Sequence, residues 1–188
     1  NSGNSGGGRP KCLWHDREGA WLVKFRHTYD PKDIGRMEYK YNEVARKCGI
    51  NVPDYKLLDG KYFASKRFDI ENGKRLHIAT AGALLNESIS NPKLDYKVLL
   101  HLTGYLTQDS QQVDEMFQRM VFNVLTDNKD DHVKNFSFIC REGKWSLAPA
   151  YDLTLCKEGY HGEHATSANN KGNPDIEDML AVGESIRI

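Results

Sequence analysis

The stretch that decides the fold of this 188-residue chain is LTDNKDDHVKNFSFI, Leu125–Ile139. It places three acidic residues, one histidine, two lysines and two asparagines between two apolar runs. Within it Asp130 and Asn135 stand five positions apart, and Asp152 follows 17 residues later. A plain solvated loop can be this polar, and so can a divalent-metal site or the catalytic loop of a phosphoryl-transfer enzyme. The sequence on either side has to distinguish these three possibilities.

The flanking segments predict a helix before this stretch and a hairpin after it. Val113–Leu125 carries apolar residues at offsets 0, 3, 4, 7, 8 and 11, which is the pattern of one helix face. After it, NFSFI, the turn CREGK and WSLAP predict a tight β-hairpin. Because a hairpin returns the chain to its starting edge, we expect Asp152 to lie close to Asn135.

Oxygen ligands from an amide and a carboxylate suit Mg²⁺, which keeps its remaining positions for water and phosphate. Asn135 and Asp152 are therefore predicted metal ligands, and Asp130 is left to accept a proton from an attacking hydroxyl. Asp131 has two interpretations, a second metal ligand or a solvated, helix-capping acid. We favour the solvated interpretation for Asp131 and for Asp127.

The first 70 or so residues predict a small lobe of antiparallel strands with one helix. Strands are expected around Lys11–Trp14 and Trp21–Phe25, and two more on either side of the Asp59-Gly60 turn. The helix is expected over Met37–Cys48, where apolar residues follow a helical period.

Three features of this lobe occur in the order that a kinase requires. A glycine-rich segment, SGNSGGGRPK, precedes the strand WLVKF, which contains Lys24. Glu38 follows at the start of the expected helix. Each feature alone is weak, because a glycine-rich start is more often a disordered end and a strand lysine is more often solvated. Chance does not readily explain why all of these features occur in this order and are then followed by the loop with Asp130 and Asn135.

The rest of the chain predicts further helices at Leu94–Leu106 and from Glu177 to Gly183. His161 and His164 have an H-x-x-H spacing, but no cysteine or carboxylate stands at ligand spacing beside them. We therefore expect them in a surface loop rather than at a zinc site.

Composition narrows the class of protein. The formal net charge is zero, which disfavours direct DNA binding and an anionic membrane partner. The four cysteines are scattered, which favours free thiols and a cytoplasmic location, and no apolar run has transmembrane length. The chain starts with NSGN and stops after a predicted helix, so we expect a fragment of a longer protein.

The chain resembles the C-terminal kinase domain of HipA-like proteins, the serine/threonine kinase toxins of bacterial toxin–antitoxin pairs. The matching stretches, in order, are GGGRPK, WLVKF, EYKYNEVARKCGINVPD, KRFD, DDHVKNFSF and LAPAYDL. The resemblance implies an α+β, two-lobed, protein-kinase-like fold that uses ATP and Mg²⁺. Residues 1–69 would form the smaller lobe and hinge, and residues 70–188 the mainly helical lobe.

The resemblance also implies residue roles. Asp130 is the catalytic base, Asn135 and Asp152 are metal ligands, and Lys24 is both catalytic and phosphate-binding with Glu38 as its partner. The implied nucleotide-binding residues are Gly6, Gly7, Gly8, Lys24, Glu38, Lys66, Phe68, Asp69, His132 and Lys134. Family members often carry an autophosphorylated serine in the glycine-rich loop, where this chain has Asn4 flanked by Ser2 and Ser5.

The implied activity is transfer of the ATP γ-phosphate to a protein serine or threonine, with an aminoacyl-tRNA synthetase or another translation factor as target. The implied partner is a HipB-like helix-turn-helix antitoxin, through which any DNA contact would be indirect. Two alternatives stay open at this point. One is a kinase of a small molecule or lipid, and the other is a non-catalytic pseudokinase module.

Overall fold

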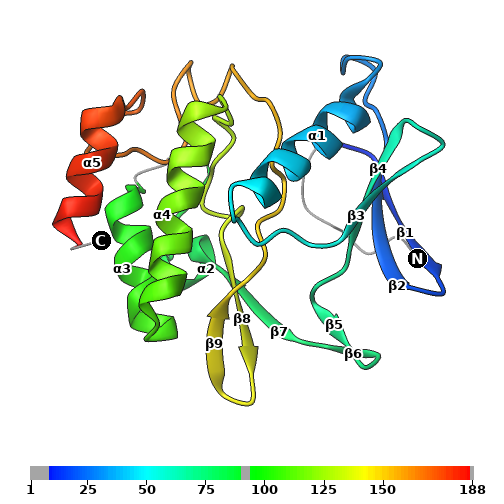
Figure 1. The fold of residues 1–188 in the computed structure, drawn as a ribbon, viewed down its shortest axis with the longest axis horizontal. Coiled ribbons are helices and arrows are strands. Elements are labelled where there is room, and N and C mark those ends of the chain that lie inside the picture. The colour runs from blue at the N-terminus through cyan, green and yellow to red at the C-terminus, as the bar shows by residue number, and fades with distance from the viewer. Residues whose placement is uncertain (1–8, 90–93, 187–188) are drawn as a thin grey trace.

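The computed structural model describes residues 9–89 and 94–186, which fold into two lobes (Figure 1). The smaller lobe is built on a four-stranded antiparallel sheet, and the larger is mainly helical. The sheet order is β1 (Lys11–Asp16), β2 (Gly19–Lys24), β4 (Tyr62–Lys66) and β3 (Tyr55–Leu58). No helix in the described residues is long and apolar enough to cross a membrane.

The β1–β2 hairpin has a local chemical cause. Asp16 Oδ1 accepts hydrogen bonds from the backbone N–H groups of Glu18 and Gly19, and Gly19 supplies a positive φ of 131°. The strand that follows alternates, so that Trp21 and Val23 are each 3% exposed and form the core of this lobe with Ala64. The same alternation leaves Lys24 at the end of β2, where the sheet meets the second lobe.

Helix α1 (Ile34–Lys47) packs against β3 and β4. It begins three residues earlier than the sequence predicted, and its buried face carries Glu38, Asn42 and Ala45. Its close approach to the sheet depends on Gly35, since a Cβ there would lie 2.0 Å from the carbonyl oxygen of Lys61.

The far end of α1 is attached to the second lobe. Ala45, Ile50 and Val52 form one apolar cluster with Phe122 of α4 and with Leu153, which follows Asp152. The cluster therefore couples the orientation of α1 to the position of the loop segment that carries Asp152.

Between the lobes the chain forms a short ribbon of β5 (Ile70–Glu71) and β6 (Lys74–Arg75), which is followed by β7 (His77–Thr80) and α2 (Ala81–Leu85). Strand β7 pairs with β8 (Ser137–Arg141), and β8 pairs with β9 (Lys144–Leu147). The predicted hairpin is therefore correct, but it is two strands of a three-stranded sheet whose third strand the sequence did not indicate.

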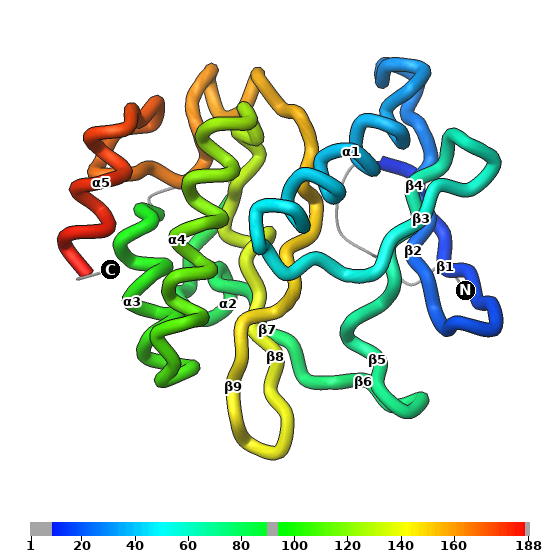
Figure 2. Tube along the Cα trace, in the orientation of Figure 1, coloured from blue at the N-terminus to red at the C-terminus, as the bar shows by residue number. Residues whose placement is uncertain are grey.

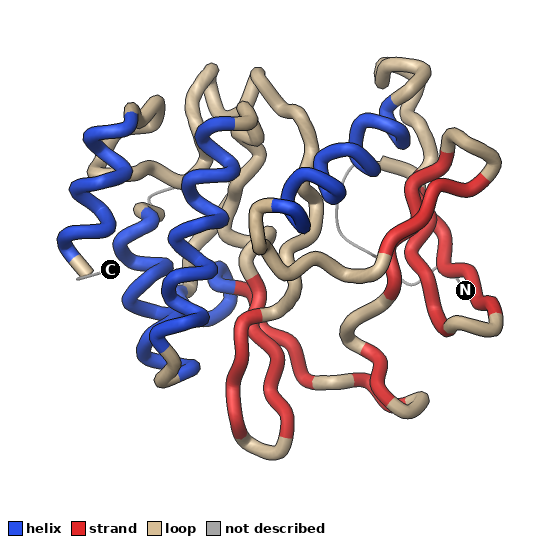
Figure 3. The backbone as a smooth tube through the Cα atoms, in the orientation of Figure 1, coloured by secondary structure: helices blue, strands red, loops and turns tan. Residues whose placement is uncertain are grey.

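The helical lobe contains α3 (Tyr96–Thr107), α4 (Ser110–Leu125) and α5 (Ile176–Ser185) (Figure 2). Each helix begins with an aspartate whose side chain accepts a backbone N–H, namely Asp95, Asp109 and Asp175. The polar stretch 126–136 leaves the end of α4 and leads into β8 (Figure 3). The long segment between β9 and α5 is mostly loop and runs beside it.

Replacement of Gly35 by alanine tests the contact that fixes α1. We expect Gly35→Ala to lower the free energy of unfolding by about 1–3 kcal/mol, because the new methyl group meets backbone atoms that have no room to move. Urea denaturation measures the change. The control is Gly104→Ala in α3, where the nearest atom, Val113 Cγ2, is at 3.4 Å. Helix propensity should make this control neutral or stabilising, and an equal loss in both variants would contradict the prediction.

Candidate active site

Lys24 lies between two carboxylates that come from different lobes. Its Nζ contacts Glu38 of α1 and lies 2.5 Å from Oδ1 of Asp152. The side chain of Glu38 is 2% exposed, whereas that of Asp152 is 35% exposed. The predicted pairing of Lys24 with Glu38 is therefore present, and Asp152 shares the same ammonium group.

The electrostatics follow from this arrangement. Burial by itself would lower the pKa of Lys24, but the carboxylates of Glu38 and Asp152 raise it well above the usual range. Burial opposes the ionised form of Asp152, yet the charge of Lys24 lowers the pKa of that carboxyl. Lys24 is thus a cation and Asp152 an anion at neutral pH, as phosphate and metal binding require.

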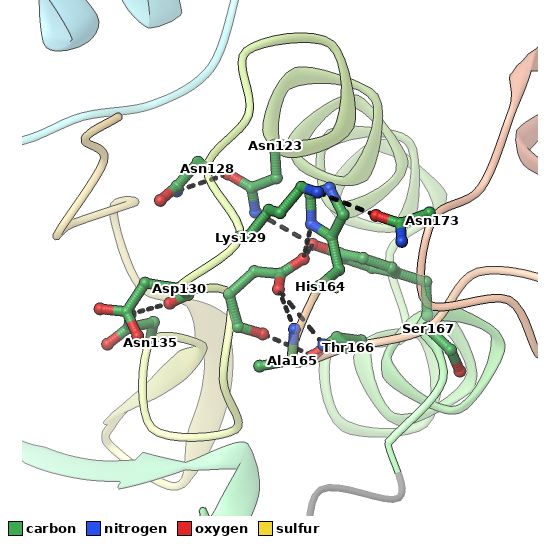
Figure 4. A network of polar contacts seen from close by, with 12 residues as sticks. Asn123, Asn128, Lys129, Asp130, Asn135, His164, Ala165, Thr166, Ser167 and Asn173 are labelled. Carbon is green, nitrogen blue, oxygen red and sulfur yellow. Dashed lines mark hydrogen bonds and ion pairs between the residues drawn. The ribbon is translucent and has the colours of Figure 1, made fainter. Parts of the chain in front are cut away.

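The loop after α4 holds Asp130 and Asn135 together. Asn135 Nδ2 donates to the backbone oxygen of Asp130 at 2.7 Å (Figure 4), so the two predicted residues are joined across one turn. Partial burial raises the pKa of the Asp130 carboxyl; His132 opposes this rise and Asp152 adds to it. The Nε2 atom of His132 lies 3.7 Å from Asp130 Oδ1.

One cavity, of about 370 Å³, lies where Asp130 and Asp152 face the smaller lobe. Its other lining residues include four basic side chains, Arg9, Lys11, Lys24 and His27. Asp30 also lines the cavity and pairs with Arg9 at 3.0 Å. A cavity lined by both carboxylates and basic side chains suits phosphate groups and a divalent cation. Thr154 also lines it; this residue is 8% exposed, and its Oγ1 has no partner among the described residues.

A neighbouring cavity, of about 300 Å³, lies at the junction of the lobes. Phe68 lines it and stacks on Tyr151, with ring centroids 5.7 Å apart. Lys24 and Asp152 line both cavities. Mostly apolar walls with a few polar groups are typical of a small-molecule site, and an aromatic base fits such walls. The two cavities together provide space for a nucleoside and its phosphates.

Lys66 and Asp69 also line this second cavity, as predicted for residues near the nucleotide. Two of the guanidinium nitrogens of Arg67, Nε and Nη2, donate to the Asp69 carboxylate. Although burial opposes it, Arg67 lowers the pKa of Asp69. Asp69 is thus an anchor for the hinge backbone rather than a free carboxylate.

The donor set at Asn135 and Asp152 fits a magnesium ion. The structure describes no group of three or more His, Cys, Asp or Glu side chains that could form an all-protein metal site. One carboxylate and one amide oxygen, with the remaining positions left to water and phosphate, is the arrangement that Mg²⁺ accepts. Because Asn135 Nδ2 is used by the loop, its Oδ1 is the atom that would face the ion.

The remaining predicted site residues make no direct contact with Lys24 or Asp152 among the contacts of the described residues. His132 lies beside Asp130, and Lys134 is exposed with its carbonyl oxygen accepting from the Tyr151 hydroxyl at 2.5 Å. Gly6, Gly7 and Gly8 lie outside the described residues, as do Ser2, Asn4 and Ser5.

Two interpretations from the sequence were wrong. Asp131 is 1% exposed, so it is not a solvated acid. His164 is 6% exposed and lies 2.9 Å from Asp131, so it is not in a surface loop. A pair of adjacent aspartates carries no signal that tells which one is buried. The sequence analysis also did not identify Tyr151, which lines the cavity at the lobe junction and stacks on Phe68. Its position next to Asp152 was a usable signal.

The chain is similar to known proteins in sequence and in fold. The model of the family described as HipA-like C-terminal domain matches residues 3–187. A relative from Sinorhizobium fredii, named "Putative kinase Y4dM", is 27% identical over an alignment of 169 residues, and the match covers 80% of this chain and 41% of the relative.

Two solved structures share the fold. One is HipA of Shewanella oneidensis, from a complex of HipA, HipB and operator DNA, with a TM-score of 0.79 and 20% identity. The match covers all of this chain and 53% of the HipA chain. The other is the Helicobacter pylori proinflammatory kinase CtkA, with a TM-score of 0.62 and 18% identity over 79% of this chain and 55% of its own.

The chain thus spans about half of the length of each of these proteins, or less. The predicted α+β, two-lobed, protein-kinase-like fold is confirmed by the two structural likenesses. From the family match over nearly the whole sequence, the chain belongs to the family of HipA-like C-terminal domains.

Proposed function

We propose that this chain is the kinase domain of a HipA-like serine/threonine protein kinase, which transfers the γ-phosphate of ATP to a protein hydroxyl. The observation that carries the proposal is that Lys24 contacts both Glu38 and Asp152, from three separate parts of the chain, while Lys24 and Asp152 line two adjoining cavities. A structural ion pair needs one carboxylate. A second, partly exposed carboxylate on the same lysine is expected where phosphate and metal replace it.

The residues divide the work as follows. Lys24, held by Glu38, would bind and orient the phosphates, and the apolar cavity lined by Phe68 and Tyr151 would receive the base. Asn135 and Asp152 would hold Mg²⁺, which supplies charge neutralisation of the phosphates when bound. Asp130 would accept the proton of the attacking hydroxyl, and its raised pKa makes it a stronger base than an ordinary aspartate.

The finer parts of the proposal come from family analogy. We propose that the chain acts in a toxin–antitoxin pair, with a HipB-like helix-turn-helix partner that makes any DNA contact. The complex of Shewanella HipA with HipB and operator DNA supports this assembly by analogy. The proposed acceptor is a protein of the translation machinery, such as an aminoacyl-tRNA synthetase, in the cytoplasm.

The proposed activity is tested by incubating the purified protein with labelled ATP, Mg²⁺ and a bacterial lysate, followed by mapping of the labelled products. Label on serine or threonine of a protein supports the proposal. Label on a metabolite or lipid would instead support a small-molecule kinase, and no labelled product would indicate a non-catalytic module.

Replacement of the proposed base should abolish transfer. We expect Asp130→Asn to reduce phosphate transfer by about 10²- to 10⁴-fold, because asparagine cannot accept the proton. Binding of MgATP, measured by calorimetry, should stay within about twofold of the wild type. The matched control is Asp127→Asn, the same chemical change three residues earlier, at a φ of 53° that asparagine tolerates. Transfer by Asp130→Asn at the wild-type rate would sink the assignment.

Removal of Asp152 should separate metal binding from nucleotide binding. We expect Asp152→Ala to weaken ADP binding in Mg²⁺ by at least about tenfold, because a metal ligand is lost. In EDTA the variant should bind ADP at least as tightly as the wild type, since a negative charge beside the phosphates is gone. Calorimetry in both buffers measures this. Asp30→Ala, which removes another acid of the same cavity, is the control. An equal loss in both buffers would refute the metal role.

A further inference from the structure

Asp131 follows the proposed base and has a different environment. Its Oδ1 accepts from the backbone N–H groups of Ala165 at 2.9 Å and Thr166 at 3.2 Å. Its Oδ2 accepts from the Tyr96 hydroxyl at 2.7 Å and lies 2.9 Å from His164 Nδ1. An ionised carboxylate offers about four acceptor positions, so all of them are occupied. Asp131 therefore has none left for a metal ion.

The direction of each hydrogen bond around Asp131 follows from the groups involved; Figure 4 labels Asn123, Asn128 and His164 of this network. Asn123 Nδ2 donates to the Tyr96 hydroxyl at 3.0 Å, which leaves the Tyr96 proton for Asp131. Asn123 Oδ1 in turn accepts from Asn128 Nδ2 at 2.9 Å. Because the Asp131 carboxylate only accepts, His164 Nδ1 is the donor in their contact. Tyr96 of α3 and Asn123 of α4 thus hold the loop through hydrogen bonds.

Asp131 also binds through its backbone. Its carbonyl oxygen accepts from Thr166 Oγ1 at 2.5 Å, so both its side chain and its main chain contact residues 164–166. The neighbouring Asp130 carboxylate is half-exposed, with only His132 nearby at 3.7 Å. The position of Asp130 is therefore set mainly by its backbone, which is held by Asn135 on one side and by Asp131 on the other.

Lys129 attaches the same segment at further points. Its backbone N–H donates to Cys156 O at 3.0 Å, and its own carbonyl accepts from Ala165. Its Nζ donates to Gly162 O at 2.8 Å and to Asn173 Oδ1 at 2.9 Å. Residues 127–131 are thus held between Cys156 and Ala165, and Cys156 lines the same cavity as Asp130.

In many kinases the corresponding segment becomes ordered only when phosphorylation adds a negative charge. Here the serine and threonine residues of the segment 153–173 are already engaged or enclosed. Thr166 is 0% exposed, Thr154 is 8% exposed, and Ser167 Oγ donates to Asp95 Oδ2 at 2.8 Å. The negative charge that orders the segment is already present in the sequence, as Asp131.

We propose that Asp131 is a positioning residue for phosphoryl transfer, which fixes residues 164–166 to the catalytic loop and thereby holds Asp130 in place without modification of the segment. The proposal rests on the proposed kinase function and goes beyond it, because it assigns the order of the site to a residue that touches neither nucleotide nor metal. Asp131 is not a catalytic residue.

The test compares Asp131→Asn with Asp178→Asn. Asp178 on α5 is also buried; its carboxylate accepts from the backbone N–H of Asp175, at the start of the same helix, and from Asn169 Nδ2. Among the described residues it makes no hydrogen bond or ion pair with residues 126–136. Both variants are assayed for the turnover number with labelled ATP and dephosphorylated casein as the acceptor probe, for KM of MgATP, and for amide exchange by mass spectrometry.

We expect Asp131→Asn to lower kcat by about 10- to 100-fold, as for a misplaced catalytic group, with KM of MgATP within about twofold. Amide protection should be lost over 156–167 and kept in the β1–β2 hairpin. Asp178→Asn should lose amide protection only around its own partners, Asn169 and Asp175, and should keep kcat within about twofold. Wild-type kcat in Asp131→Asn, or an equal loss of kcat in both variants, would overturn the proposal.

Two further outcomes are decided in advance. If Asp131→Asn does not fold, Thr166→Val removes the hydroxyl bond to the Asp131 carbonyl alone, and the same split between kcat and KM supports the proposal while unchanged kcat and exchange overturn it. If the wild type transfers no phosphate to any acceptor, the kinase function fails. Amide exchange then decides the anchoring by itself, and protection of 156–167 that survives Asp131→Asn overturns it.

Discussion

The contact between Lys24 and two carboxylates is the constraint on which the rest of the structure depends. Glu38 reaches Lys24 only because Gly35 lets α1 approach the sheet, and Asp152 reaches it only because the hairpin brings the chain back to the lobe junction. The apolar cluster of Ala45, Phe122 and their neighbours holds these two supports at a fixed distance. The Lys24 ammonium group is paired with both carboxylates only when the two lobes pack correctly. Because an unpaired buried charge is costly, this contact favours the correct packing.

The catalytic loop is supported from the opposite side by polar rather than apolar contacts. Asp131, Tyr96 and Asn123 form a buried network of hydrogen bonds, which favours one geometry of the loop. At its end Asn128 donates to Asn123, while the buried Oδ1 of Asn128 has no partner among the described residues. The exposed base and its buried neighbour are adjacent in the chain but have opposite environments. A loop that must present a reactive side chain to solvent can do so only if its backbone is held elsewhere.

Much of the fold followed from the sequence, because the signals were local. The helical period of α4, the hairpin after it and the alternation around Lys24 each depend on neighbouring residues, and all appear in the structure. Strand β7 was missed because its only partner, β8, lies some 60 residues away and nothing local marks it. The burial of Asp131 and His164 was missed for the same reason, since it arises from a segment that is distant in sequence.

The shared lysine has a consequence for the order in which ligands arrive. In the described structure Asp152 already has a tethered counter-ion, so a free divalent cation competes with an ammonium group that cannot diffuse away. Nucleotide phosphates remove that competitor by offering Lys24 new oxygen partners. Under the proposed function we therefore expect metal and nucleotide to enter as one complex, in which Lys24 would exchange the Asp152 carboxylate for phosphate oxygens.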